Sequence, residues 1–194
     1  MRVLGVDPGL RLTGYGCVEM TPAAPPILIE AGVIRIRRAQ TGRTAPEIAP
    51  RLLELDADFR AILARLRPDA VGVEQIFTHP KHPGTGVIMA HARGVLLLAA
   101  AAAGLPLVEL RPTQIKKSLT SYGQADKAQM QKAIQGVFGL DEPPSPPDVA
   151  DALAIALCAG QRLSSDLPAP TSARSARGRR LPPHLKALID PPDA

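Results

Sequence analysis

Aromatic residues are scarce in this sequence of 194 residues: they make up 3% of it, and tryptophan is absent. A folded core must therefore be built from Ala, Val, Leu and Ile, and the hydrophobic content of 45% is high enough to exclude wholesale disorder. Cysteine is equally rare. Cys17 and Cys158 lie far apart and form no C-x-x-C motif, which argues against a disulfide scaffold or a cysteine zinc site and favours a reducing compartment.

Long hydrophobic runs are also missing. The longest, residues 94–107, is about one-half to two-thirds of a membrane span. Asp7 interrupts the first apolar run, so the start of the sequence does not resemble a signal peptide. We therefore expect a cytoplasmic protein that is not attached to a membrane. The net charge of +5 fits a polyanionic partner such as nucleic acid, although only weakly.

The hydrophobic periodicity predicts an α/β fold. Three short strands joined by short links come first, followed by helices that alternate with single strands. The expected strands are 3–6, 13–18, 26–36, 70–76 and 106–110, and the expected helices are 48–66, 85–103, 112–119, 126–138 and 148–163. This order predicts a mixed five-stranded sheet, three antiparallel strands and then parallel ones, flanked by helices. Residues 1–163 would form the domain, and the Pro/Ser/Arg-rich residues 164–194 a disordered tail.

Four carboxylates stand where apolar residues would be expected. Asp7 ends the first strand. Glu74 lies inside the expected strand 70–76, directly after an apolar run. Asp148 and Asp151 share one face at the start of a buried helix. Each has an alternative interpretation. Asp7 suits a turn, and Glu74 could face solvent at the end of its strand. Asp148 is a good helix cap, and acids near a helix N-terminus are favoured, which applies less to Asp151 because it lies inside the helix.

If these acids converge, their like charges require compensation, and hard divalent cations are the natural partners of carboxylates. Two such ions about 4 Å apart can bind the attacking water and the leaving oxygen of a phosphodiester. The pattern of acids therefore points to metal-assisted phosphoryl chemistry.

The motifs together resemble the RuvC family of bacterial Holliday-junction resolvases, which have a ribonuclease-H-like fold. The matching segments are Gly5-Val6-Asp7-Pro8-Gly9, Thr13-Gly14-Tyr15-Gly16, Glu74-Gln75-Ile76-Phe77, Ala92-Arg93-Gly94 and Asp148 to Ala156. They run in order through residues 1–162, which is the whole predicted domain. The resemblance implies a homodimeric endonuclease that resolves four-way DNA junctions by symmetric paired nicks in recombination and repair. It also implies cooperation with the RuvA and RuvB branch-migration proteins.

The resemblance also assigns roles to single residues. It implies that Asp7, Glu74, Asp148 and Asp151 bind Mg²⁺ or Mn²⁺, two ions per subunit, with the role of Asp148 the least fixed because some members carry histidine there. It further implies that Phe77 stacks on bases at the crossover and that Lys116 and Lys127 act near the catalytic centre on DNA. Without the resemblance, Phe77 would be a core residue and the two lysines solvated surface residues.

Other functions are compatible with parts of the pattern. One alternative is an ATP-binding protein of the actin and sugar-kinase type, which also has an aspartate in its first turn. A second is a related single-domain nuclease that acts on RNA during ribosome maturation. A third is a junction-binding protein in which the acids are inactive. One departure from the family concerns residues 78–86, where two prolines give a stiffer loop than in many relatives. His79 and His82 in this loop are not expected to bind the metal.

Overall fold

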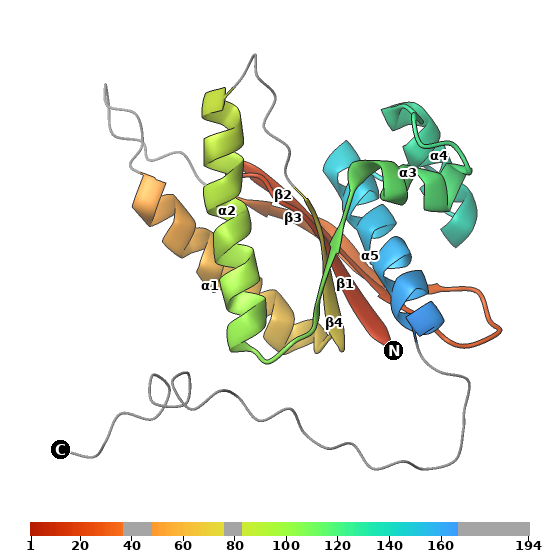
Figure 1. Ribbon diagram of the computed structural model, residues 1–194, viewed down its shortest axis with the longest axis horizontal. Coiled ribbons are helices and arrows are strands. Elements are labelled where there is room, and N and C mark those ends of the chain that lie inside the picture. Colours follow the sequence, from red (N-terminus) through yellow and green to blue (C-terminus); the bar gives the residue numbers. More distant parts are fainter. Residues whose placement is uncertain (37–47, 76–82, 167–194) are drawn as a thin grey trace, which may run out of the picture.

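The computed structural model of the chain describes residues 1–36, 48–75 and 83–166. Its centre is a five-stranded sheet with the strand order β3-β2-β1-β4-β5 (Figure 1). The strands are β1 (Arg2–Asp7), β2 (Leu12–Glu19), β3 (Ile27–Arg35), β4 (Ala70–Glu74) and β5 (Leu107–Leu110). β1, β2 and β3 pair antiparallel, whereas β4 runs parallel to β1 and β5 parallel to β4. The predicted mixed sheet is therefore confirmed.

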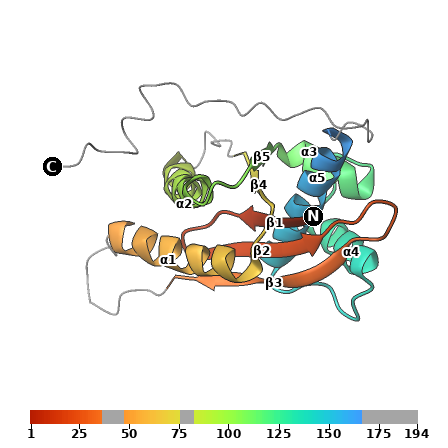
Figure 2. The same cartoon turned by 90° about the horizontal axis from the view of Figure 1, so that it is seen from below.

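Helices cover both faces of this sheet. They are α1 (Ile48–Leu66), α2 (Pro83–Ala102), α3 (Pro112–Thr120), α4 (Lys127–Phe138) and α5 (Pro147–Asp166). α1 and α2 lie on one face, and α5 crosses the other with α3 and α4 beside it (Figures 1 and 2). None of the helices in the described ranges is long and apolar enough to span a membrane.

The face under α1 and α2 is packed with large side chains. Because side chains alternate along a strand, Leu4 and Val6 of β1 point to this face and meet Phe59 of α1 and Leu96 of α2 in one buried cluster. All four side chains are almost fully buried. Tight packing of branched and aromatic side chains thus holds these helices on the sheet.

The opposite face carries glycines where α5 crosses it. The register pairs Gly5 of β1 with Gly72 of β4, so both lie beneath the helix. A Cβ on Gly5 would lie 2.1 Å from the carbonyl oxygen of Ala152, and one on Gly14 of β2 would lie 2.1 Å from that of Asp148. The backbone of α5 therefore rests almost directly on the strands, which only glycine permits.

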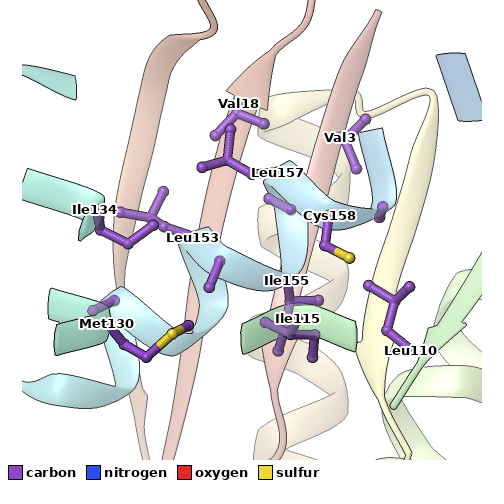
Figure 3. Close-up of a cluster of buried hydrophobic side chains, with 14 of the residues drawn as sticks. Val3, Val18, Leu110, Ile115, Met130, Ile134, Leu153, Ile155, Leu157 and Cys158 are labelled. Carbon is purple, nitrogen blue, oxygen red and sulfur yellow. The ribbon is translucent and has the colours of Figure 1, made fainter. Parts of the chain in front are cut away.

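Around this contact the core is completed by apolar side chains from several elements. Val3 and Val18 of the sheet, Leu153 and Ile155 of α5, and Ile115 of α3 belong to the same buried cluster (Figure 3). This cluster fixes α3 and α4 to α5, and thereby places their surfaces next to the ends of β4 and β5.

The helix predicted at 48–66 has the observed bounds, whereas the other four differ by one to three residues at one or both ends, most at the start of α2 and the end of α5. α2 begins at Pro83 rather than at residue 85, because proline suits the first turn of a helix, where its missing N–H is not needed. α5 continues to Asp166, past the predicted end at 163. The hydroxyls of Ser164 and Ser165 donate to carbonyl oxygens one turn back, each at 2.8 Å, which extends its last turn. The predicted tail from 167 onward lies outside the described residues.

Candidate active site

Asp7 and Glu74 end two neighbouring parallel strands. The register pairs Val6 of β1 with Val73 of β4, so the two acids that follow occupy corresponding positions at the same edge of the sheet. Alternation places both on the face that carries Gly5 and Gly72, which is the face of α5. Adjacent strand ends in a parallel pair are a common place for functional groups to meet.

The turn after Asp7 is held by Thr13, a fully buried polar residue of β2. Its hydroxyl donates to the carbonyl oxygen of Gly9 at 2.6 Å and accepts from the N–H of Gly9 at 3.2 Å. These two hydrogen bonds close the β1–β2 connection and fix the backbone just beyond Asp7. The Asp-Pro-Gly turn expected from the sequence is therefore present, and it does not prevent Asp7 from facing α5.

α5 brings two more carboxylates to this edge. Asp148 stands in its first turn and Asp151 one turn further, on the same side of the helix. Because Gly14 lies directly opposite Asp7 in the β1–β2 ladder, the start of α5 comes down beside Asp7 without a clash. The glycine contact thus sets the position of the two helix acids relative to the two strand acids.

The electrostatics show that these acids lie close enough to affect one another. Burial, followed by the charges of Asp151, Glu74 and Asp148, raises the pKa of Asp7 from 3.8 to about 8. The charge of Lys127 acts in the opposite direction. At neutral pH, Asp7 therefore favours a proton or a nearby cation over the bare charged state.

Glu74 and Asp151 show the same tendency. Burial and then the charge of Asp151 raise the pKa of Glu74, while Lys116 lowers it. Burial is also the main reason why the pKa of Asp151 is raised; Asp148 adds to that rise, and Lys127 and Lys116 oppose it. Both lysines are thus part of the same electrostatic environment as the acids.

A pocket of about 260 Å³ is lined by two of the four acids, Glu74 and Asp151, and by both lysines. It is lined by residues from β4, α3, α4 and α5, namely Glu74, Pro112, Ile115, Lys116, Asp126, Lys127, Met130, Asp151 and Ile155. Lys127 is the first residue of α4, which is capped by Asp126 through a hydrogen bond from the N–H of Gln129 at 2.8 Å. The capped helix end fixes the backbone from which Lys127 reaches the pocket.

The donor set suits a hard divalent cation, because every candidate ligand is a carboxylate oxygen. Within residues 1–36, 48–75 and 83–166, however, no three Asp, Glu, His or Cys side chains are gathered into a ready-made metal group. Mutual repulsion of carboxylates opposes such a close cluster. The residues fit a metal in kind and in location, and ligation by Asp7, Glu74, Asp148 and Asp151 stays a prediction.

The described residues do not include Phe77, His79 or His82, so the predicted role of Phe77 stays a prediction.

Two residues near the candidate acids were not singled out by their own chemistry in the sequence. Thr13 and Arg93 entered only as parts of motifs, yet the first holds the turn after Asp7 and the second holds the backbone of Glu74. The only sequence signal for both was their place inside those motifs.

Comparison with known proteins adds to this geometry. Residues 3–159 match the family model described as crossover junction endodeoxyribonuclease RuvC. The chain belongs to the RuvC family. A RuvC of Caldicellulosiruptor saccharolyticus is 41% identical over 158 residues, covering 81% of this chain and 91% of that protein. A RuvC of Salinispora arenicola is 44% identical over 160 residues, covering 81% of this chain and 86% of the relative.

A solved structure of RuvC has the same fold. The structure of T. thermophilus RuvC in complex with a Holliday junction substrate superposes with a TM-score of 0.71 and 34% sequence identity. The likeness covers 81% of this chain and 92% of that one. The ribonuclease-H-like architecture expected from the sequence is therefore confirmed. Residues 3–159, which match the family model, contain all four candidate acids.

Proposed function

We propose that this chain is a crossover junction endodeoxyribonuclease, which resolves four-way DNA junctions by metal-dependent hydrolysis of phosphodiester bonds. The observation that carries the proposal is the meeting of Asp7 and Glu74, on adjacent parallel strands, with Asp148 and Asp151 of α5. The pocket lined by Glu74 and Asp151, which Lys116 and Lys127 also line, supports it. Membership of the RuvC family supports the choice of substrate.

In this proposal the four carboxylates hold two Mg²⁺ or Mn²⁺ ions. Such ions, when bound, activate a water for in-line attack and stabilise the departing 3′ oxygen. Asp7 is the shared ligand in this proposal, because the charges of Asp151, Glu74 and Asp148 all act on it. Glu74 approaches from β4, and Asp148 and Asp151 approach from the first turns of α5.

Lys116 and Lys127 then act on the DNA rather than on the metal. Both lie in the pocket lined by Glu74 and Asp151, from which a lysine ammonium can reach a phosphate oxygen. Such a contact binds the DNA backbone and stabilises negative charge that develops on the phosphate. Phe77 would stack on an unpaired base near the crossover, a contact worth about 1–3 kcal/mol.

Paired nicks require two active sites, so we propose a homodimer. α2 offers a suitable surface, because Val87, Ile88 and Leu98 are exposed apolar residues on it. Its small residues, such as Ala90 and Gly94, permit a close approach of two helices. Cooperation with RuvA and RuvB in the cytoplasm follows from the family alone.

Two observations favour this function over the alternatives. An actin-like or sugar-kinase-like ATPase has no need for acids from β4 and α5 to meet Asp7, and a junction-binding protein without activity has no need to retain four of them. A nuclease specific for structured RNA would share the chemistry, and only the choice of substrate separates it from a resolvase.

The decisive experiment is cleavage of a synthetic four-way DNA junction in Mg²⁺, with the products resolved by strand. We expect symmetric nicks in two strands of like polarity, with 5′-phosphate ends. Asp7→Asn should lower the rate by about 10³-fold or more, because one ligand of both ions loses its charge. Junction binding without divalent ions should persist.

The matched control is Asp58→Asn, an exposed aspartate of α1 on the other side of the sheet, which should cleave like the wild type. Structured RNA and linear duplex serve as competing substrates. Near-normal cleavage by Asp7→Asn would overturn the assignment of the site, and preferential cleavage of RNA would overturn the substrate.

A further inference from the structure

Arg93 links three elements behind the proposed active site. It lies in the middle of α2, and its Nε donates to the backbone carbonyl oxygen of Glu74 at 3.1 Å. Its Nη2 forms an ion pair with the carboxylate of Glu109 on β5. The Arg93 side chain is only 18% exposed, so it is held between the helix and the sheet. One guanidinium therefore ties α2 to the ends of both β4 and β5.

These contacts occur where β4 leaves the β-ladder. The β1–β4 pairing ends at Val6 and Val73, one residue before Glu74. On the other side, the N–H of Gln75 still donates to the carbonyl oxygen of Leu110 at 2.8 Å. The carbonyl of Glu74 accepts its hydrogen bond from Arg93, beyond the last pair with β1. Arg93 thus holds β4 at Glu74, one residue beyond the last pair with β1.

Arg93 acts from the face opposite to the reaction. Val108 and Leu110 of β5 point into the α5-side core, so Glu109 between them points to the α2 side, where Arg93 meets it. The carboxylate of Glu74, in contrast, lines the pocket on the α5 side. Arg93 does not line that pocket, and it acts on Glu74 only through the backbone.

We propose that Arg93 is a positioning residue that fixes the end of β4, so that the carboxylate of Glu74 is aimed at the metal shared with Asp7. This inference rests on the proposed role of Glu74 as a metal ligand. Ligands of this kind must be held within about 0.5 Å of their working position. The hydrogen bond from Arg93 holds the carbonyl group that is bonded to the Cα of Glu74, and it therefore restricts the direction of the Glu74 side chain.

The chemistry of the guanidinium suits this task. Its planar fork donates to the carbonyl and to the carboxylate at the same time, whereas a lysine ammonium is a single point charge on a flexible stem. Glu109, whose side chain is about half exposed, also balances the charge of the mostly buried Arg93. Glu109→Gln therefore removes the ion pair and keeps the bond to Glu74.

The test compares Arg93→Gln, Arg93→Lys and Glu109→Gln with the wild type. Two quantities are measured: the Mg²⁺ concentration that gives half the maximal cleavage rate on a four-way junction, and the rise in Tm on adding Mn²⁺ without DNA. We expect Arg93→Gln to raise the half-saturating Mg²⁺ concentration by about 10-fold, as removal of residues that orient metal ligands does. The Mn²⁺-dependent rise in Tm should shrink in parallel, and saturating Mg²⁺ should restore most of the rate.

Arg93→Lys should resemble Arg93→Gln, because an ammonium on a flexible stem does not reproduce the fixed planar spacing of Nε and Nη2. Glu109→Gln should show a smaller shift in the same direction. Arg60→Gln is the matched control: it removes an exposed ion pair with Asp56 on α1 and should leave the Mg²⁺ dependence unchanged. A lower Tm with wild-type Mg²⁺ and Mn²⁺ responses would make Arg93 merely structural and overturn the inference.

If Arg93→Gln does not fold, the Mg²⁺ and Mn²⁺ responses of Arg93→Lys decide, and wild-type values would overturn the inference. Failure of the proposed function is distinguishable. A wild-type chain that is stabilised by Mn²⁺ but cuts no junction would contradict the substrate, while the Mn²⁺ responses of the variants would still test Arg93.

Discussion

On the α1/α2 face of the sheet, Phe59 and Leu96 fill the space between helix and strand, whereas on the α5 face Gly5 and Gly72 leave almost none. The first face is stabilised by the volume of its side chains, and helices there can adjust by repacking. On the second face the backbone of α5 touches the strands, so the distance between the helix and the sheet depends on the glycines having no side chains. Because α5 carries Asp148 and Asp151, that distance also determines the geometry of the candidate active site.

The largest effect is expected when a side chain is added on the α5 face. In Gly5→Ala the new Cβ would lie 2.1 Å from the carbonyl oxygen of Ala152 and 2.4 Å from the N of Ala156, so the backbone of α5 must move. We expect a loss of about 3 kcal/mol or more in the free energy of unfolding. Displacement of the helix acids should also reduce the cleavage rate about 10²-fold.

The control for this prediction is Gly136→Ala in α4, where a Cβ meets nothing within 4 Å. Higher helix propensity should raise stability there by about 0.5–1 kcal/mol. Denaturant unfolding and junction cleavage check both variants. A Gly5→Ala protein with wild-type stability would show that α5 does not rest on the strands as described.

On the other face we expect a loss of stability of similar size, but without the loss of cleavage rate. Phe59 is fully buried, and Phe59→Ala should cost about 3–5 kcal/mol through the cavity that it leaves. Because the acids stand on the opposite face, the cleavage rate well below Tm and its Mg²⁺ dependence should stay near wild type. Should Phe59→Ala change the Mg²⁺ dependence as strongly as Gly5→Ala does, the two faces would not be separable.

The smallest effect concerns pH, and here the faces should differ in sign. The pKa of Asp7 is raised to about 8, so the stability that its proton contributes is full below pH 3.8 and is lost as the pH rises to about 8. For metal-free protein we therefore expect Asp7→Asn to be more stable than the wild type. This difference should grow between pH 4 and pH 8 and reach a few kcal/mol.

Glu30 on the α1/α2 side is the control with the opposite sign. Its hydrogen bond from Arg65 lowers its pKa below the ordinary 4.5, so its contribution is present above that value and lost as the pH falls further. Glu30→Gln should lower stability at pH 7 by less than about 1 kcal/mol, because the ion pair is largely exposed. Thermal unfolding from pH 3 to pH 9 checks both. A parallel pH profile for Asp7→Asn and the wild type would contradict the coupling of the acids.

Periodicity in the sequence was sufficient for much of this architecture. Alternating and helical apolar patterns predicted all five strands and the mixed sheet, because local patterns determine which face each element buries. Glu74 stood out because a carboxylate directly follows an apolar run. The spacing of Asp148 and Asp151 placed both on one helix face, since residues three apart are neighbours there.

What the sequence could not supply depends on register. Gly5 and Gly14 entered the sequence analysis only as parts of motifs, and Gly72 did not enter it at all. Their common contact with α5 follows only from how β1, β2 and β4 are aligned. Arg93 and Glu109 likewise meet across two elements that the sequence separates by 16 residues. The predicted ends of α2 and α5 were off by a few residues, because Pro83 and Ser164 are compatible with a helix as well as with a loop.

The order of the elements has a consequence for synthesis of the protein. β1, with Asp7, leaves the ribosome well before α5, with Asp151, which is the last helix within the described residues. A chain made only as far as α4 lacks both the helix that covers the glycines and two of the four candidate acids. If the four acids act together as proposed, nuclease activity can arise only after α5 has been made.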